Sequence, residues 1–344
     1  MANRGSGRNE TDVIMPVRRD VPWLQASLSS IASQSLQPSG VTVVDDGLRN
    51  PGVVADLGKR LFGNRFCFLS NSGRGISAAL NTGIRHSSAL WIARMDADDI
   101  AHPTRLEKQL EFLHGAPDEV LGCGTQCRFI SRDGITIGRS KLPTSWETTA
   151  ARILSRTCFV HPTLVLRREV LLRAPYRSSM DGAEDVDLIL RLSETGRVLN
   201  LNEVLLDYRL HPAQESFRSR ARHTAVQELA IRAAFSRLHG KEDPLETNPG
   251  LAERFIDWRL STPGYVRSRT FLTALRYMNL HLSHFDFKGF ARCASVSIES
   301  LPLTPSALTL AWRVGKKAGA ALLDQDTPFA ALNIDPSEPS PCAS

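Results

Sequence analysis

The first hundred residues alternate between apolar segments and helix-like segments, and this alternation restricts the fold more than any other feature. The apolar segments are predicted to be strands at about 12–17, 41–45, 65–69 and 90–95. The segments between them are predicted to be helices at about 21–35, 51–62 and 76–86. Because strands that are separated by helices usually pair in parallel, the sequence predicts an α/β fold with a doubly wound sheet.

Beyond residue 115 the pattern indicates that the sheet becomes mixed. Two apolar segments at 120–130 and 135–137 are separated by a turn that ends in Gly134, which predicts an antiparallel hairpin. The further predicted elements are a helix at 146–153, a strand at 164–166, a helix at 184–192, a strand at 198–206 and a long helix between 214 and 238. The predicted fold class is therefore a mixed, mostly parallel sheet flanked by helices, with a helical C-terminal extension.

The chain of 344 residues, 42% of them hydrophobic, is long enough for one large domain with an appendage. The predicted boundaries are a disordered leader at 1–10, an α/β domain at 11–240, a linker at 241–250, a helical C-terminal region at 251–325 and a disordered tail at 326–344. In the helical C-terminal region, aromatic and aliphatic residues at helical spacing are interleaved with arginines. Two interpretations of it stay open, a small helical bundle and a surface that rests on an anionic membrane.

The charge of the chain indicates which partners to expect, and its cysteines and apolar segments indicate where it is located. The formal net charge of +6 suits an anionic partner such as a nucleotide or an anionic lipid surface. Nucleic acid is not expected, because the sequence has no aromatic-rich basic motif and no Cys/His finger. The six cysteines lack paired spacing, there is no apolar signal segment, and no stretch approaches the roughly 20 apolar residues that span a bilayer. We therefore expect a cytoplasmic protein, with peripheral contact at the inner face of the cell membrane as the open alternative.

Three carboxylates directly follow the fourth predicted strand. They are Asp96, Asp98 and Asp99. In open α/β sheets ligands bind at the carboxyl ends of the strands, and hard divalent cations share carboxylate oxygens with substrate phosphates. The cluster therefore predicts a cation site, with Asp98 as its first ligand. The alternative interpretation is an acidic turn, and Asp99 in particular is expected to cap the following segment.

Three other short motifs accompany this cluster. The second predicted strand ends in Asp45-Asp46-Gly47, a glycine-flanked loop carries Arg74, and a predicted helix starts with Glu184-Asp185. In this order along the chain, the motifs and the acidic cluster resemble those of the family 2 inverting glycosyltransferases of the GT-A fold. The resemblance covers roughly residues 10–212. It implies an enzyme that transfers a sugar from a nucleotide-diphosphate donor to a saccharide or lipid-linked acceptor, with Mn²⁺ or Mg²⁺ as cofactor.

The resemblance also implies roles for the acidic residues. Asp98 would meet the metal, and Asp96 would approach the donor ribose or sugar. Asp185 matches the catalytic base that takes the proton of the acceptor hydroxyl, and Glu184 would hold the acceptor or the loop. For both members of this pair, capping of the helix N-terminus and its dipole is the structural alternative.

The remaining implied roles concern the donor and the metal shell. Pro16, Val17 and Asp45 would surround the base and ribose of the donor, and Arg74 would meet its diphosphate. His211 would complete the metal shell, as a late histidine does in some GT-A enzymes. A histidine before a proline is also commonly structural, and the same holds for His161.

The resemblance suggests a role in cell-surface polysaccharide or glycolipid synthesis, which rests on analogy of fold. One alternative is a noncatalytic protein that binds sugar nucleotides. A second is a phosphatase or phosphotransferase of the HAD type, although its Asp-x-Asp element should follow the first strand and not the fourth. A dinucleotide-dependent dehydrogenase is disfavoured, because the first strand is not followed by G-x-G-x-x-G.

Overall fold

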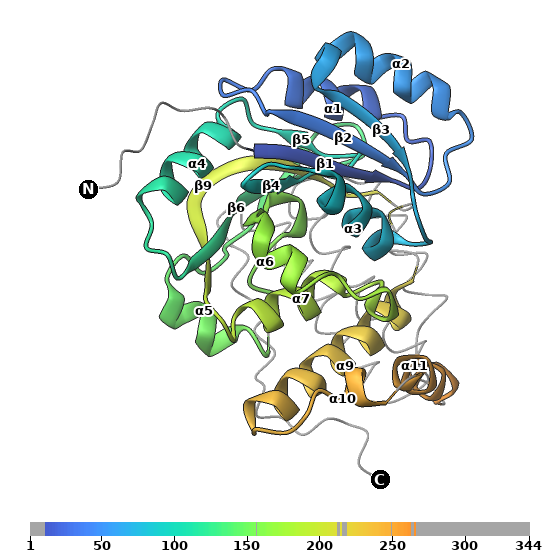
Figure 1. Cartoon of the computed structure of the whole chain (residues 1–344), viewed down its shortest axis with the longest axis vertical. Helices are drawn as coiled ribbons and strands as arrows, with labels where there is room; N and C mark the ends of the chain where they lie inside the picture. Colours follow the sequence, from blue (N-terminus) through green and yellow to red (C-terminus); the bar gives the residue numbers. More distant parts are fainter. Residues whose placement is uncertain are drawn as a thin grey trace, which may run out of the picture. The chain divides into compact units, whose positions relative to one another are not determined.

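The computed structural model describes residues 11–265, apart from 156, 212–213, 215–218, 249 and 263–264 (Figure 1). The predicted leader, the predicted tail and the helical C-terminal region beyond residue 265 lie outside the described residues. Within the described part of the chain, no helix has the length and apolar character needed to cross a bilayer.

The N-terminal half of the sheet is parallel, as the sequence predicts. Its strands are β1 (Thr11–Val17), β2 (Gly40–Asp45), β3 (Phe66–Ser70) and β4 (Trp91–Arg94). β1 lies between β2 and β4, and β3 pairs with the outer side of β2. All four carboxyl ends therefore meet at one edge of the sheet, where the acidic loop follows β4.

The second half of the sheet mixes strand directions. Its strands are β5 (Ile100–Ala101), β6 (Val120–Ile130), β7 (Thr136–Arg139), β8 (Val165–Arg167) and β9 (Arg197–Arg209). The order is β3-β2-β1-β4-β8-β6-β9-β5, with β7 paired to β6. β8 is antiparallel to both of its neighbours, β6 and β9 are parallel, and the hairpin of β6 and β7 forms as predicted. The mixed, mostly parallel sheet is thus confirmed.

Helices cover both faces of this sheet. One face carries α1 (Leu24–Ala32), α2 (Pro51–Phe62) and α4 (Arg105–Gly115), and the other carries α3 (Ile76–His86), α6 (Arg168–Arg173) and α7 (Glu184–Leu192) (Figure 1). The alternation of side chains along β1 produces the two cores. Val13 and Met15 pack in the first cluster, whereas Ile14 packs in the second.

Short elements connect these layers. They are η1 (Gly63–Arg65), α5 (Trp146–Arg152), η2 (His161–Thr163) and η3 (Ser178–Met180). β5 and α6 were not predicted, because elements of two and six residues show too little periodicity in the sequence. The predicted last strand also ended too early, since β9 continues to Arg209 and so reaches the acidic loop.

Among the described residues, three helices follow the sheet. They are α9 (Arg220–Leu238), α10 (Pro244–Thr247) and α11 (Leu251–Ser261). Leu190 of α7, Val226 of α9 and Ile256 of α11 belong to one buried cluster. The stretch 241–250 therefore carries a helix of its own between two helices that pack in the same core.

Candidate active site

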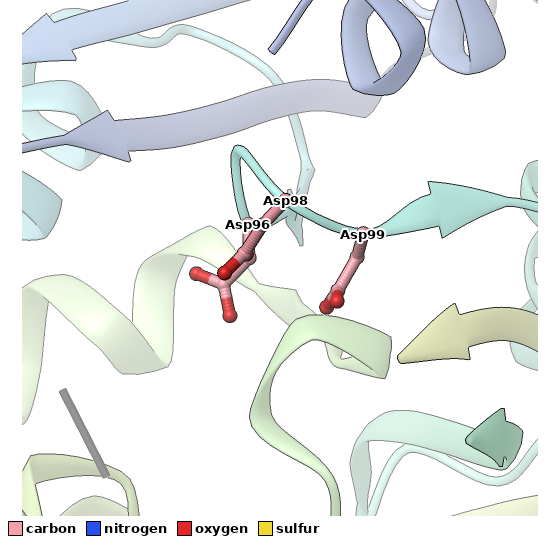
Figure 2. Close-up of side chains that lie close together, drawn as sticks. All are labelled: Asp96, Asp98 and Asp99. Carbon is pink, nitrogen blue, oxygen red and sulfur yellow. The ribbon is translucent and has the colours of Figure 1, made fainter. Parts of the chain in front are cut away.

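The loop after β4 gathers the three predicted carboxylates. One oxygen from each of Asp96, Asp98 and Asp99 lies within 4.8 Å of the others. Figure 2 shows the three side chains pointing to the same side of the loop. The loop is held to α1, because the Ser27 hydroxyl donates to the carbonyl oxygen of Asp96 at 2.8 Å. The sequence prediction that these side chains share one site is consistent with this geometry.

His211 lies against this cluster although it is 113 residues away in sequence. Its Nε2 is 2.8 Å from Oδ2 of Asp98. The imidazole is only 7% exposed, and the ring of Trp23 lies 4.6 Å from it. Packing against Trp23 fixes the ring plane, so that Nε2 is directed at the carboxylate. The imidazole and the carboxylate together provide the mixed N and O donor set that a divalent transition metal accepts.

Arg209, at the end of β9, fixes the position of the acidic loop. Its backbone N–H donates to Oδ1 of Asp99 at 2.8 Å, and its Nε donates to the carbonyl oxygen of Asp98 at 2.9 Å. The expectation that Asp99 caps the following segment is wrong, because α4 begins at Arg105 after the N-cap residue Thr104. Asp99 instead joins the loop to β9.

Asp99 and Asp96 are both in environments that disfavour their charge. Burial, followed by the nearby charge of Asp98, raises the pKa of Asp99 well above its usual value. Oδ2 of Asp99 is buried and accepts no hydrogen bond from the described residues. Burial also raises the pKa of Asp96 to about 6, while the ion pair with Arg94 opposes this rise. A buried carboxylate oxygen without a donor is chemically suited to a cation.

Glu184 and Asp185 form the first turn of α7. The N-cap residue is Ala183, so neither side chain occupies the N-cap position itself. Oε2 of Glu184 accepts from the backbone N–H of Gly182 at 2.9 Å, and Oδ1 of Asp185 accepts from the N–H of Val186 at 2.8 Å. Their position still complements the positive end of the helix dipole.

Electrostatics connect this turn with the acidic loop. Burial raises the pKa of Asp185, and the charge of Glu184 adds to the rise. Glu184 also contributes to the raised pKa of Asp96. The first turn of α7 and the loop after β4 therefore act on each other through space.

The residues predicted to bind the donor lie at the ends of β1 and β2. Pro16 and Val17 pair with Val44 and Asp45 across the two strands. Val17 is 1% exposed, and its carbonyl oxygen accepts from the N–H of Asp46 at 2.9 Å. Oδ1 of Asp45 accepts from the backbone N–H groups of the next two loop residues, Gly47 at 2.8 Å and Leu48 at 2.7 Å. This oxygen stabilises its own turn.

The loop that carries Arg74 is held in place from both sides. Oδ1 of Asp46 accepts from the N–H of Gly75 at 3.0 Å and from the amide of Asn71 at 2.6 Å. On the other side, Oδ1 of Asp181 accepts from the N–H of Ser77 at 3.1 Å. Arg74 itself is exposed. Its guanidinium therefore projects from a fixed loop into solvent.

Three contributors to the site escaped the sequence analysis. Arg94 pairs with Asp96, Arg209 holds the acidic loop, and Asp181 holds the Arg74 loop. Arg94 and Arg209 are the last residues of β4 and β9, and both are buried, which is unusual for arginine and is not apparent from the sequence. Asp181 belongs to no motif in the sequence, and its only sequence feature is that it precedes the predicted helix at 184–192.

Comparison with known proteins identifies the class of enzyme. The sequence model of the family described as Glycosyl transferase family 2 matches residues 12–173. The O-antigen biosynthesis glycosyltransferase WbnJ of Escherichia coli is 32% identical over 208 residues, which are 58% of this chain and 79% of that protein. EpsE of Bacillus subtilis, named as a glycosyltransferase, is 30% identical over 219 residues, which are 62% of this chain and 76% of that protein.

Solved structures agree on the fold. The mannosyltransferase PcManGT from Pyrobaculum calidifontis, in complex with GDP-Man and Mn²⁺, superposes with a TM-score of 0.51 at 16% identity, covering 93% of this chain and 88% of that chain. S. aureus TarS 1–349, in complex with UDP-GlcNAc, gives a TM-score of 0.50 at 15% identity, covering 86% of this chain and 93% of that chain. The predicted GT-A fold is confirmed.

The chain belongs to glycosyltransferase family 2. It is therefore a glycosyltransferase of the class that takes its sugar from a nucleotide-sugar donor. This assignment removes the support for the phosphatase and dehydrogenase alternatives, and the resemblance noted in the sequence is confirmed.

Proposed function

We propose that this enzyme is a metal-dependent inverting glycosyltransferase that transfers a sugar from a nucleoside diphosphate to a saccharide or lipid-linked acceptor. The observation that carries the proposal is the contact of His211 Nε2 with Asp98 Oδ2 at 2.8 Å, beside two further carboxylates. The use of the product in cell-surface polysaccharide or glycolipid synthesis is supported by the similarity to a protein of O-antigen biosynthesis.

The donor chemistry of the site fits Mn²⁺ or Mg²⁺. Asp98 and His211 would hold the cation, and the partnerless buried oxygen of Asp99 lies in the same cluster. When bound, the cation stabilises negative charge on the departing diphosphate. Asp96, oriented by Arg94, then accepts hydrogen bonds from the donor ribose or sugar. The structural neighbour PcManGT is a complex with Mn²⁺, which supports this choice of cofactor.

Asp185 is the proposed base. Its carboxylate takes the proton from the acceptor hydroxyl while that oxygen forms a bond to the anomeric carbon on the face opposite the leaving nucleotide. The bond from the anomeric carbon to the diphosphate oxygen breaks, and the nucleotide leaves with both electrons of that bond. Inversion at the anomeric carbon follows. On the donor side, Pro16, Val17 and Asp45 would contact the base and ribose, and Arg74 would contact the diphosphate.

We place the reaction in the cytoplasm, with peripheral contact at the inner face of the membrane. The described cysteines, Cys67, Cys123, Cys127 and Cys158, are free thiols. The net charge of +6 favours an anionic surface, and Trp258 on α11 is 54% exposed. Binding to vesicles with and without anionic lipid, measured by sedimentation, tests the membrane contact, which binding independent of lipid charge would contradict.

Thermal shift with a panel of nucleoside diphosphates tests the proposed site. We expect one nucleotide to raise the melting temperature in Mn²⁺ but not in EDTA, and the shift to disappear in Asp98→Ala. Asp118→Ala is the matched control, because Asp118 is exposed and precedes β6, at the sheet edge away from the acidic loop. If no nucleotide raises the melting temperature of the wild type, the proposal is contradicted. Nucleotide binding without turnover on any acceptor would instead support the noncatalytic alternative.

A further inference from the structure

A buried polar chain lies behind the proposed base and has no part in the mechanism above. It consists of His161 on η2, Tyr176 and Glu184, which are 7%, 5% and 6% exposed. His161 Nε2 is 2.8 Å from the Tyr176 hydroxyl, and His161 Nδ1 is 3.6 Å from Oε1 of Glu184. The His161 ring therefore has a polar neighbour at each nitrogen, as a buried polar group needs.

The surroundings select one form of the imidazole. Burial, followed by the positive charge of Arg94, lowers the pKa of His161 to about 3, so the ring is neutral at physiological pH. A neutral imidazole carries one hydrogen. Oε1 of Glu184 faces Nδ1 at 3.6 Å, which is too long for a hydrogen bond, but a lone pair on Nδ1 would repel the carboxylate, so the hydrogen lies on Nδ1. Nε2 is then the acceptor of the hydrogen bond from the Tyr176 hydroxyl.

Hydrogen bonds hold the two outer members of this group of buried side chains, Tyr176 and Glu184, in place. The backbone N–H of Tyr176 donates to Oδ1 of Asn81 at 3.1 Å, and the Asn81 amide donates to the carbonyl oxygen of Tyr176 at 2.8 Å, which fixes Tyr176 to α3. At the other end, Oε2 of Glu184 accepts from the N–H of Gly182. Both oxygens of Glu184 therefore face protein groups, whereas the neighbouring Asp185 uses only Oδ1 to accept from Val186.

We propose that His161 is a positioning residue for sugar transfer, which in its Nδ1–H form links Tyr176 to Glu184 and thereby fixes the Asp185 carboxylate against the acceptor hydroxyl. The proposal rests on the proposed function, since it takes Asp185 as the base. It also gives Glu184 a different part from acceptor binding: Glu184 orients the turn from which its neighbour reacts.

The tautomer can be measured without any assay of activity. Two-dimensional ¹H–¹⁵N NMR of protein labelled at the histidine nitrogens, with His161 assigned from the signals lost in His161→Gln, reports which ring nitrogen carries hydrogen. We expect Nδ1–H and a bare Nε2 from about pH 5.5 to 8. A doubly protonated ring in this range, or the Nε2–H form, would overturn the proposal.

Kinetics test the consequence for the reaction. The probes are UDP-GlcNAc and GDP-mannose in Mn²⁺, with release of nucleoside diphosphate to a mixture of p-nitrophenyl glycosides or to water. We expect Tyr176→Phe and His161→Gln to lower kcat about 10- to 100-fold while the KM of the donor stays unchanged. Thr163→Val is the matched control, because it removes two hydrogen bonds of the Thr163 hydroxyl in η2, to the carbonyl of Val160 and from the N–H of Thr125, and neither involves His161, Tyr176 or Glu184.

The outcomes separate this inference from the proposed function. If Asp185→Asn turns over like the wild type, the assignment of the base fails and this inference fails with it. If Asp185→Asn is inactive while Tyr176→Phe and His161→Gln keep the wild-type kcat, only the inference about His161 fails. If the three variants Tyr176→Phe, His161→Gln and Thr163→Val lose melting temperature and kcat in the same proportion, the role of His161 is structural. Should none of the probes turn over, the NMR measurement decides.

Discussion

The carboxylate of Asp181 occupies the space that a side chain at position 75 would need. A Cβ placed on Gly75 would lie 1.9 Å from Oδ2 of Asp181, and Gly75 has a φ of +86°. The close approach joins the loop that carries Arg74 to the segment just before α7. The loop that carries Arg74 and the segment just before α7 are therefore in direct contact, through a position that only glycine can fill.

Gly75→Ala should weaken donor binding. The methyl group must displace Asp181, and the positive φ costs a further 1–2 kcal/mol, roughly, for any residue with a Cβ. Gly134→Ala is the matched control, because Gly134 has a φ of +85° and no atom within 4 Å of the added Cβ. We expect both variants to melt earlier but only Gly75→Ala to lose nucleoside diphosphate affinity, by about tenfold, in calorimetric titration. Equal affinities in the two variants would contradict the coupling.

Asp185→Asn should abolish transfer and leave donor binding intact. The amide keeps the shape of the side chain but cannot take a proton, so the loss should fall on kcat, by about 10²–10⁴-fold. Steady-state kinetics together with nucleotide titration make this comparison. A rise in donor KM with unchanged kcat would show that Asp185 binds substrate and is not the base.

The pH dependence of transfer should report the ionisation of Asp185. Because burial raises the pKa of this carboxyl, it becomes protonated at a higher pH than an exposed aspartate does. The base must be ionised, so kcat should be constant at neutral pH and fall about tenfold per pH unit below the raised pKa. The profile should be measured at saturating donor, with melting curves at each pH to exclude unfolding. A rate that rises as the pH falls would contradict a carboxylate base.

Metal binding should depend on His211. His211→Gln removes the imidazole nitrogen that faces Asp98, and we expect the affinity for Mn²⁺ to fall about 10- to 100-fold, as for other changes in metal sites. Electron paramagnetic resonance of free Mn²⁺ measures this directly. His102→Gln serves as the control, since His102 is exposed. If the two variants bind Mn²⁺ equally well, His211 is not a ligand.

Asp187 on α7 should be a major determinant of stability. It is fully buried, with Arg191 Nη2 at 2.9 Å and Arg177 Nη1 at 3.4 Å from its two oxygens. Asp187→Ala takes this carboxylate from two partly buried arginines, and although Arg177 keeps Asp243 and Glu246, we expect a cost of about 3 kcal/mol. Glu169→Ala, which breaks an exposed pair with Arg173, should cost only about 0.3–0.5 kcal/mol. Urea unfolding of the two variants makes the comparison, and equal costs would rule out this role for Asp187.

The sequence predicted the parallel half of the sheet because each strand there is a continuous apolar segment. The bounds of α3 and α7, at 76–86 and 184–192, match the prediction for the same reason, since their periodicity is unbroken over nine or more residues. β5 has only two residues, and its existence depends on pairing with β9 about a hundred residues later. No local pattern encodes such a pairing.

Some residues of the candidate site could also be predicted from the sequence, and others could not. The acidic cluster was predictable, because its members are adjacent in sequence and follow an apolar strand. The place of His211 came only from resemblance to a family, since spacing alone cannot reveal a contact across 113 residues. The buried ion pair of Arg94 with Asp96 and the close contact of His161 with Glu184 were missed, because each depends on which strands and turns become neighbours in the folded chain.

The reversed direction of β8 brings two segments of different origin to the same edge of the sheet. β8 is antiparallel to both of its neighbours, β4 and β6. At the sheet edge where the acidic loop follows the end of β4, the turn η2 therefore lies before the start of β8. The acidic loop thus leaves a strand end, whereas η2, whose His161 lies beside Glu184, leads into a strand beginning. Loops of this kind tolerate changes of length and sequence, and the two segments can therefore vary separately because they belong to different strands.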